Sequence, residues 1–87
     1  MQVLLLTQEG CNPCRRVKRI LGEIAREVPD LTLTEASFDS ERGMELAAQH
    51  QILYPPAVLL DGRLVGKGKI REEELRRAVG APLPRVP

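Results

Sequence analysis

The sequence predicts an α/β protein in which a four-stranded mixed sheet is flanked by three helices, in the order β-α-β-α-β-β-α. Three observations support this prediction. The hydrophobic period changes repeatedly along the chain between strand-like and helix-like stretches. Proline and glycine residues separate these stretches. An Asp61-Gly62 dipeptide stands between two apolar runs, which is typical of a β-hairpin.

Length and composition are those of a small globular protein. The chain has 87 residues, and we expect one domain at residues 1–80 followed by a proline-rich tail at 81–87. The formal net charge of +1 gives no electrostatic case for binding nucleic acid or an anionic membrane. The apolar run Val3 to Leu6 is too short for a signal-peptide core or a membrane span, so we expect a cytoplasmic location.

The first two predicted elements are a buried strand and an amphipathic helix. Gln2–Thr7 is a compact apolar run, which fits a strand covered on both faces. From Pro13 to Val28 apolar residues recur at intervals of three and four, as on one side of a helix. Asn12 can cap this helix, and Pro13 suits its first position because the missing N–H is unpaired there anyway. Gly22 costs about 1 kcal/mol relative to alanine inside the helix, and close packing would explain its presence.

A second strand and helix follow. Leu31–Thr34 alternates between apolar and polar residues and predicts a strand parallel to the first, through a right-handed crossover. The alternation breaks at Glu35-Ala36, which predicts a bulge or the end of the strand. Asp39-Ser40-Glu41 is typical of a helix start, and the helix is expected to reach Gln49 or His50. Its apolar residues are Met44, Ala47 and Ala48.

The last part of the chain predicts a hairpin and a third helix. Ala57–Leu60 and Arg63–Val65 flank the Asp-Gly pair, whose residues suit the positive φ angles of a type I′ turn. A helix is expected from about Ile70 to Val79, because acids open this stretch and arginines close it, in agreement with the helix dipole. Gly80 is a natural residue to follow the helix end.

Two cysteines stand three positions apart between the first strand and the first helix. Cys11 lies at the helix N-terminus, where unpaired N–H groups and the helix dipole favour a thiolate, and Arg15 and Arg16 add to this effect if they fold back. Cys14 shares the buried stripe with Val17 and should be shielded. One exposed thiolate beside one sheltered thiol suits a two-step exchange, in which the first attacks an external disulfide and the second resolves the mixed disulfide.

The region around the cysteines resembles a known family. The strand–Cys11-Asn12-Pro13-Cys14–helix unit, the element order, a proline opening the third strand and the Asp-Gly hairpin together resemble the glutaredoxins and thioredoxin-like redoxins. This resemblance covers about residues 2–80. It implies the thioredoxin fold and a thiol-disulfide oxidoreductase in which Cys11 and Cys14 are catalytic, with Asn12 and Pro13 supporting them.

The same resemblance assigns a role to the segment before the third strand. It implies that Pro56 is a cis-proline facing the cysteine pair, and that Tyr54, Pro55 and Pro56 bind the substrate. The residue before such a proline can pair its backbone with an extended substrate, as an added strand would. Pro55 has no N–H, so only its carbonyl can take part. Tyr54 either lines the substrate groove or packs against the hairpin.

The resemblance also implies the kind of partner. We expect a disulfide-containing protein or small thiol as substrate, another protein or a thiol pool as electron donor, no bound cofactor, and a monomer. Proline before the second cysteine resembles the reducing thioredoxins, which favours a disulfide reductase or electron carrier. The Gly-Gly and acidic pair that hold glutathione in glutaredoxins are not matched by Gly66–Lys69, which leaves the use of glutathione open.

Other interpretations of the cysteine pair remain. The two residues also suit an inert structural disulfide, or a soft-metal chaperone that holds Cu(I) through two thiolates. Heavy-metal-associated domains, however, carry a methionine two residues before the first cysteine, where this chain has Glu9. A redoxin-fold scaffold without catalysis is a further alternative.

Overall fold

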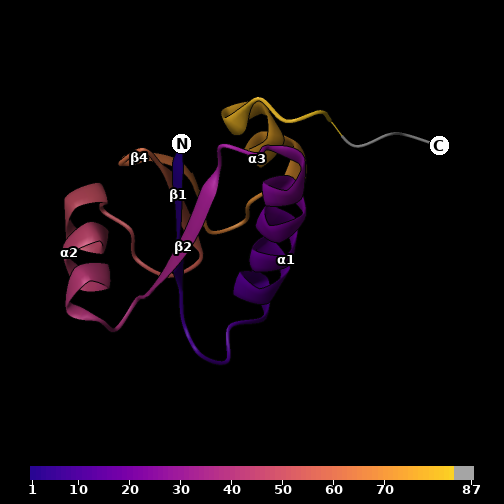
Figure 1. Cartoon of the computed structure of the whole chain (residues 1–87). Helices are drawn as coiled ribbons and strands as arrows, with labels where there is room; N and C mark the ends of the chain where they lie inside the picture. The colour runs from indigo at the N-terminus through magenta and orange to yellow at the C-terminus, as the bar shows by residue number, and fades with distance from the viewer. Residues whose placement is uncertain (84–87) are drawn as a thin grey trace.

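The computed structural model describes residues 1–83 and has the predicted fold class; residues 84–87 of the predicted tail lie outside the described residues. A four-stranded mixed sheet has the order β2-β1-β3-β4. Helix α2 covers one face of this sheet, and α1 and α3 cover the other (Figure 1). The elements are β1 (Gln2–Thr7), α1 (Asn12–Glu27), β2 (Thr32–Ser37), α2 (Glu41–His50), β3 (Ala57–Leu60), β4 (Arg63–Lys67) and α3 (Glu72–Val79).

The first strand, β1, lies inside the sheet and is buried on both faces, as predicted. It pairs in parallel with β2 and antiparallel with β3. Val3 and Leu5 belong to the larger hydrophobic core beneath α1 and α3, whereas Leu4 and Leu6 belong to the smaller core beneath α2. The continuous apolar run therefore arises because successive side chains of a strand serve opposite faces of the sheet.

The second strand, β2, is longer than predicted, and the expected bulge or strand end at Glu35-Ala36 is wrong. The register between β1 and β2 runs without interruption through Ser37. Leu33 packs against the core beneath α1 and α3, whereas Ala36 packs against the core beneath α2. The hydrophobic phase changes because residues three apart in a strand point to opposite faces, and each face of the sheet here has its own core.

The buried side of α2 also differs from the prediction. Ser40 caps the helix as expected, but Met44 is 56% exposed and Ala48 is also exposed. The buried residues of this helix are Gly43 and Ala47. A Cβ atom at Gly43 would overlap the carbonyl oxygen at the end of β2. The hydrophobic pattern missed this contact because glycine carries no side chain that would place it on an apolar stripe.

The hairpin has the predicted turn. Asp61 and Gly62 have φ angles of 49° and 84°, which are the positive values that a type I′ turn requires. The pairing of β3 with β4 shifts between Val58 and Leu59, so β4 contains a bulge and continues to Lys67.

The third helix begins later than expected and is joined to α1 by a buried arginine. Arg71 occupies the N-cap position of α3 with an extended backbone and makes no side-chain capping hydrogen bond, and the helix starts at Glu72. Arg76 is only 7% exposed, and its guanidinium donates to Glu27 at 2.7 Å, to Glu72 at 2.9 Å and to the carbonyl of Pro82 at 2.9 Å. Hydrogen bonds to Glu27 and then to Glu72 raise the pKa of Arg76. This network holds the first residues after α3 against the domain.

Close packing does not explain Gly22, since a Cβ atom there would meet no atom within 4 Å. We predict that Gly22→Ala raises the free energy of unfolding by about 1 kcal/mol, because alanine has the higher helix propensity. Urea denaturation measures this change. The matched control is Gly43→Ala, for which the overlap with the end of β2 should lower stability by about 1–3 kcal/mol. A destabilised Gly22→Ala variant would contradict the prediction.

We predict that Arg76→Ala lowers the free energy of unfolding by about 2 kcal/mol, because it leaves Glu27, Glu72 and the Pro82 carbonyl without their donor. Thermal and urea unfolding measure the loss. Arg71→Ala is the control, because Arg71 makes only exposed ion pairs and its removal should leave the unfolding midpoint near that of the wild type. Equal losses in the two variants would refute a special role for the buried arginine.

Candidate functional site

The two cysteines form a disulfide at the junction of β1 and α1, with their Cα atoms 5.2 Å apart. After β1 the chain turns through Gly10, whose φ of 79° lies in the region that favours glycine. Cys11 then occupies the N-cap of α1, and Cys14 lies in the first turn of the helix. The strand and the helix thus place both sulfur atoms at the edge of the sheet where β1 ends.

The two sulfur atoms have different surroundings. Cys14 is 1% exposed, whereas Cys11 is half-buried. The backbone N–H of Cys14 donates to Sγ of Cys11 at 3.2 Å. This N–H and the positive end of the α1 dipole both lie at Sγ of Cys11. Cys14 is therefore sheltered as predicted, whereas Cys11 is less buried than Cys14 but not fully exposed.

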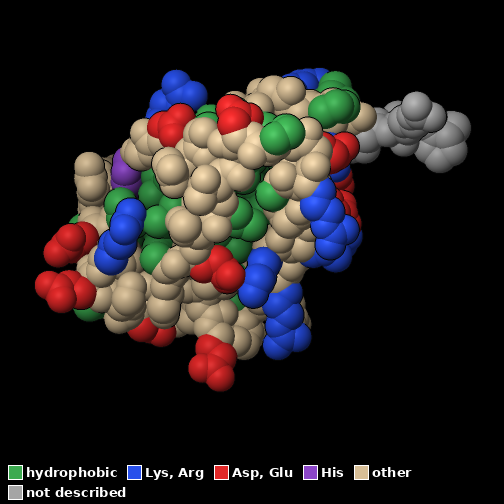
Figure 2. All heavy atoms as spheres, in the orientation of Figure 1, with side chains coloured by type: hydrophobic (Ala, Val, Ile, Leu, Met, Phe, Trp, Pro, Cys, Tyr) green, Lys and Arg blue, Asp and Glu red, His purple; other side chains and the backbone are tan. Residues whose placement is uncertain are grey.

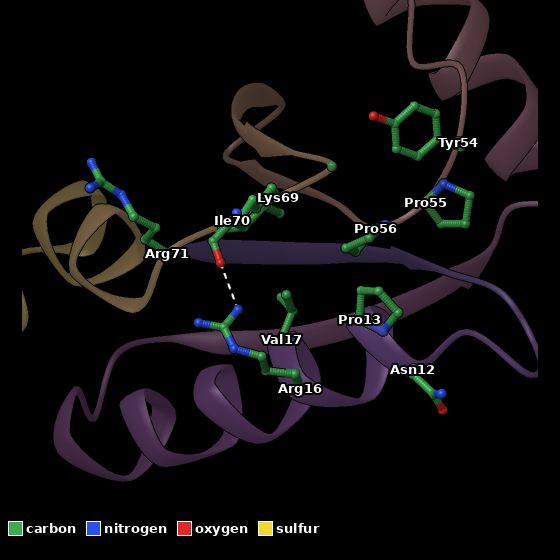
Figure 3. A pocket seen from close by; sticks show the side chains of 11 residues that line it. Asn12, Pro13, Arg16, Val17, Tyr54, Pro55, Pro56, Lys69, Ile70 and Arg71 are labelled. Carbon is green, nitrogen blue, oxygen red and sulfur yellow. Dashed lines mark hydrogen bonds between the residues drawn. The ribbon is translucent and has the colours of Figure 1, made fainter.

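The neighbours of the cysteines differ in detail from the predictions. Cys11 rather than Asn12 caps α1, so Asn12 is the first helical residue and Pro13 the second. Proline is still tolerated there because N–H groups in the first turn have no partner within the helix. Arg16 does not fold back towards Cys11, because its guanidinium donates to the Ile70 carbonyl at 2.7 Å (Figure 3). Arg15 lines a separate hollow along the exposed side of α1.

A groove of about 740 Å³ adjoins the disulfide. Its walls come from the start of α1, from the segment before β3, and from the connection between β4 and α3 (Figure 3). The two residues between the cysteines form part of its wall, which places the disulfide beside the opening. The residues that line it are Asn12, Pro13, Arg16, Val17, Tyr54, Pro55, Pro56, Gly68, Lys69, Ile70 and Arg71.

Tyr54 lines this groove and also packs against Gly68, the residue that follows the hairpin. The side chain is 62% exposed. A Cβ atom at Gly68 would lie only 3.2 Å from the Tyr54 hydroxyl oxygen, so the ring rests against this glycine. The glycine thereby leaves room for the aromatic side chain at the groove wall.

The two prolines after Tyr54 lie on the same wall. The Pro55–Pro56 peptide bond is cis. Pro56 is buried, and its carbonyl accepts a hydrogen bond from the backbone N–H of Gly68 at 2.8 Å. Within residues 1–83 the carbonyl of Pro55 has no hydrogen-bond partner. The structure thus leaves one backbone acceptor free beside the groove.

The third wall is the connection from Gly68 to Arg71. The sequence alone related Gly66–Lys69 only to glutathione and did not place Ile70 or Arg71 beside the cysteines. The directions of the strands show why this connection lies near the cysteines. Since β1 is antiparallel to β3, and β3 is antiparallel to β4, β1 and β4 run in the same direction. Their carboxyl ends therefore lie at the same edge of the sheet, and the segment after β4 reaches the segment after β1.

Between residues 1 and 83 there is no group of three or more His, Cys, Asp or Glu side chains that could hold a metal ion. None of the described helices combines the length and the apolar character needed to cross a membrane.

Comparison with known proteins supports the fold. No protein-family model matches the chain, and no curated protein sequence matches it. Among solved structures it is similar to mitochondrial thioredoxin 3 from Saccharomyces cerevisiae in the oxidized form, with a TM-score of 0.67, 20% identity, and 91% of this chain and 76% of that chain covered. It is also similar to Fasciola hepatica thioredoxin, with a TM-score of 0.66, 23% identity and coverage of 91% and 77%. Thioredoxin O2 from Arabidopsis thaliana in the oxidized state has a TM-score of 0.69, 17% identity and coverage of 91% and 71%.

These similarities agree with the four-stranded mixed sheet and the three helices of this chain. The chain has the thioredoxin fold, with a Cys-x-x-Cys disulfide at the start of its first helix.

Proposed function

We propose that the protein is a thiol-disulfide oxidoreductase that acts as a disulfide reductase or electron carrier. One observation carries this proposal. A half-buried Cys11 at the N-cap of α1 is bonded to a buried Cys14, and an open groove adjoins the pair. A disulfide with only a structural role would need neither this difference in exposure nor a neighbouring groove.

The two cysteines have separate roles in the proposed exchange. In the reduced protein the Cys11 thiolate attacks one sulfur of a substrate disulfide, and the other substrate sulfur leaves as a thiolate that takes a proton from water. Cys14 then gives its proton to water and attacks Sγ of Cys11, which breaks the mixed disulfide and releases the second substrate sulfur as a thiolate. The products are a fully reduced substrate and the Cys11–Cys14 disulfide that the structure contains. Two electrons have passed from the protein to the substrate.

The groove provides the surface against which the substrate chain is held. Tyr54 and the two prolines that follow form one wall, and Pro13 faces them from α1 (Figure 3). The free carbonyl of Pro55 can accept a hydrogen bond from a backbone N–H of an extended substrate. Pro55 has no N–H to return, so the substrate backbone is held here by one hydrogen bond rather than two. Asn12, the first residue of α1, contributes to the wall of the groove beside Cys11.

The proposal includes the partners and the setting of the exchange. The substrate is a disulfide-containing protein or the disulfide of a small thiol compound, and a reductase or thiol pool returns the electrons. The reaction transfers electrons between sulfur atoms, so the chemistry itself needs no bound cofactor. A monomer in the cytoplasm suits this role, because thiol systems there keep dithiols reduced. Glutathione is not assigned as the reductant.

We predict that Cys11→Ser abolishes the reduction of insulin in the presence of dithiothreitol. Cys14→Ser keeps the attacking sulfur and loses the resolving one, so it should accumulate a mixed disulfide that intact-mass spectrometry detects. In the reduced wild type, iodoacetamide at neutral pH should modify Cys11 roughly tenfold faster than Cys14, because Cys11 is only half-buried and lies at the helix N-terminus, whereas Cys14 is buried. Equal insulin reduction by all three proteins would refute the proposal.

We predict that Pro55→Val binds an extended peptide about fivefold more tightly, because valine adds the N–H that proline lacks. Isothermal titration with a peptide, together with exchange rates for a peptide disulfide, measures the effect. The control is 2-hydroxyethyl disulfide, which has no peptide backbone and should react at the wild-type rate. Unchanged peptide affinity and unchanged exchange rate would show that this backbone contact does not contribute to substrate binding.

A further inference from the structure

The groove beside the disulfide is uncharged at one end and positively charged at the other. Figure 3 shows Tyr54, Pro55 and Pro13 at the end nearest the start of α1, and Arg16 and Arg71 towards the opposite end. Lysine and arginine side chains also gather on the face of the molecule where α1 lies (Figure 2). The cations that line the groove are Arg16, Lys69 and Arg71, and no Asp or Glu is among the lining residues.

Two of these three cations have no carboxylate partner within residues 1–83. Arg16 uses one N–H on the Ile70 carbonyl, which holds its guanidinium at the groove wall, and it makes no ion pair with the described acids. Lys69 is exposed and makes neither an ion pair nor a side-chain hydrogen bond with the described residues. These two side chains leave positive charge in the groove uncompensated.

Arg71 differs from these two cations. It lies 3.4 Å from Glu73 and 3.0 Å from Glu74, so two carboxylates offset its charge. Its hydrogen bond to Glu74, together with both negative charges, raises the pKa of Arg71. The attraction that the groove exerts on an anion therefore comes from Arg16 and Lys69.

We propose that the preferred substrate is a protein disulfide in an extended segment with Asp or Glu one to three residues from the reacting cysteine. This inference rests on the proposed function. The carboxylates of the substrate pair with Arg16 and Lys69 while the cysteine reaches Cys11. The spacing follows from the fold. Arg16 lies one helical turn beyond Pro13, a rise of about 5 Å along α1. An extended chain advances about 3.3 Å per residue, so one to three residues, together with the reach of these long side chains, span the groove.

The expected preference for acidic over neutral peptides is modest because the groove is exposed to solvent. A solvent-exposed ion pair changes an affinity by up to about fivefold, and salt screens it. Two such pairs predict that kcat/KM for an acidic peptide disulfide exceeds that for a neutral one by about tenfold at low salt. A lysine-flanked peptide should react more slowly than the neutral one, because like charges then meet in the groove.

The test uses three synthetic peptide disulfides that differ only in carrying Asp, Asn or Lys at two positions beside the reacting cysteine. Reduction of each is measured with the wild type, Lys69→Gln, Arg16→Gln and Arg63→Gln. Lys69→Gln removes no described hydrogen bond or ion pair, so it should fold normally. Arg63→Gln is the matched control, since it changes the net charge equally and Arg63 is exposed at the end of the sheet remote from Cys11.

With the wild type, we expect kcat/KM for the acidic peptide to be about tenfold that for the neutral peptide. Lys69→Gln and Arg16→Gln should each lower this ratio of kcat/KM values about threefold. Arg63→Gln should retain the wild-type ratio. Raising the salt concentration should reduce the ratio towards one. Equal kcat/KM for the three peptides, or an equal loss in Arg63→Gln, would overturn the inference.

A neutral reference disulfide, 2-hydroxyethyl disulfide, separates this inference from the proposed function. If the wild type reduces the reference compound but treats the three peptides alike, the oxidoreductase activity stands and the acidic preference is wrong. If neither the reference compound nor any peptide is reduced, the oxidoreductase proposal fails and the inference fails with it.

Discussion

The start of α1 determines the properties of both cysteines and so of the whole site. At this point Sγ of Cys11 accepts the backbone N–H of Cys14 and lies at the positive end of the helix dipole. Three residues later the helix has turned Cys14 into the core, where water does not reach it. The start of α1 therefore gives the two cysteines different burial and different electrostatic surroundings. The proposed exchange needs this difference, because Cys11 must attack the substrate disulfide and Cys14 must resolve the mixed disulfide afterwards.

The sheet brings three separate connections to the junction of β1 and α1. Because β1 and β4 run in the same direction, the segments that follow them meet at one edge of the sheet, and the segment before β3 joins them there. Buried hydrophobic residues on both faces of β1 hold this edge in position. The resulting groove combines apolar walls with a backbone acceptor at Pro55 and with charges at Arg16 and Lys69 that have no partner within residues 1–83. The proposed substrate is an extended chain held by these features.

Local patterns predicted most of the fold because each element has a strong local signal. The apolar run of β1, the period of α1 and the Asp-Gly turn all led to the observed structure. The errors in β2 and α2 share one physical cause. Ala36 and Met44 were misread, and the contact of Gly43 was missed, because the environment of these residues depends on packing between distant elements. The capping sulfur of Cys11 was missed because cysteine is not among the usual cap residues.

The sequence by itself determined the order of the elements, the fold class and the position of the cysteine pair at a helix start, since these depend on hydrophobic period and on the backbone preferences of proline and glycine. Tertiary structure alone decided what surrounds that pair. Arg16 turns to Ile70 rather than to Cys11, and Lys69 reaches the groove, because contacts between α1 and the segment after β4 join residues more than fifty positions apart. A local sequence pattern does not show which residues so far apart in the chain will be in contact, so the charge of the groove can be recognised only in the folded structure.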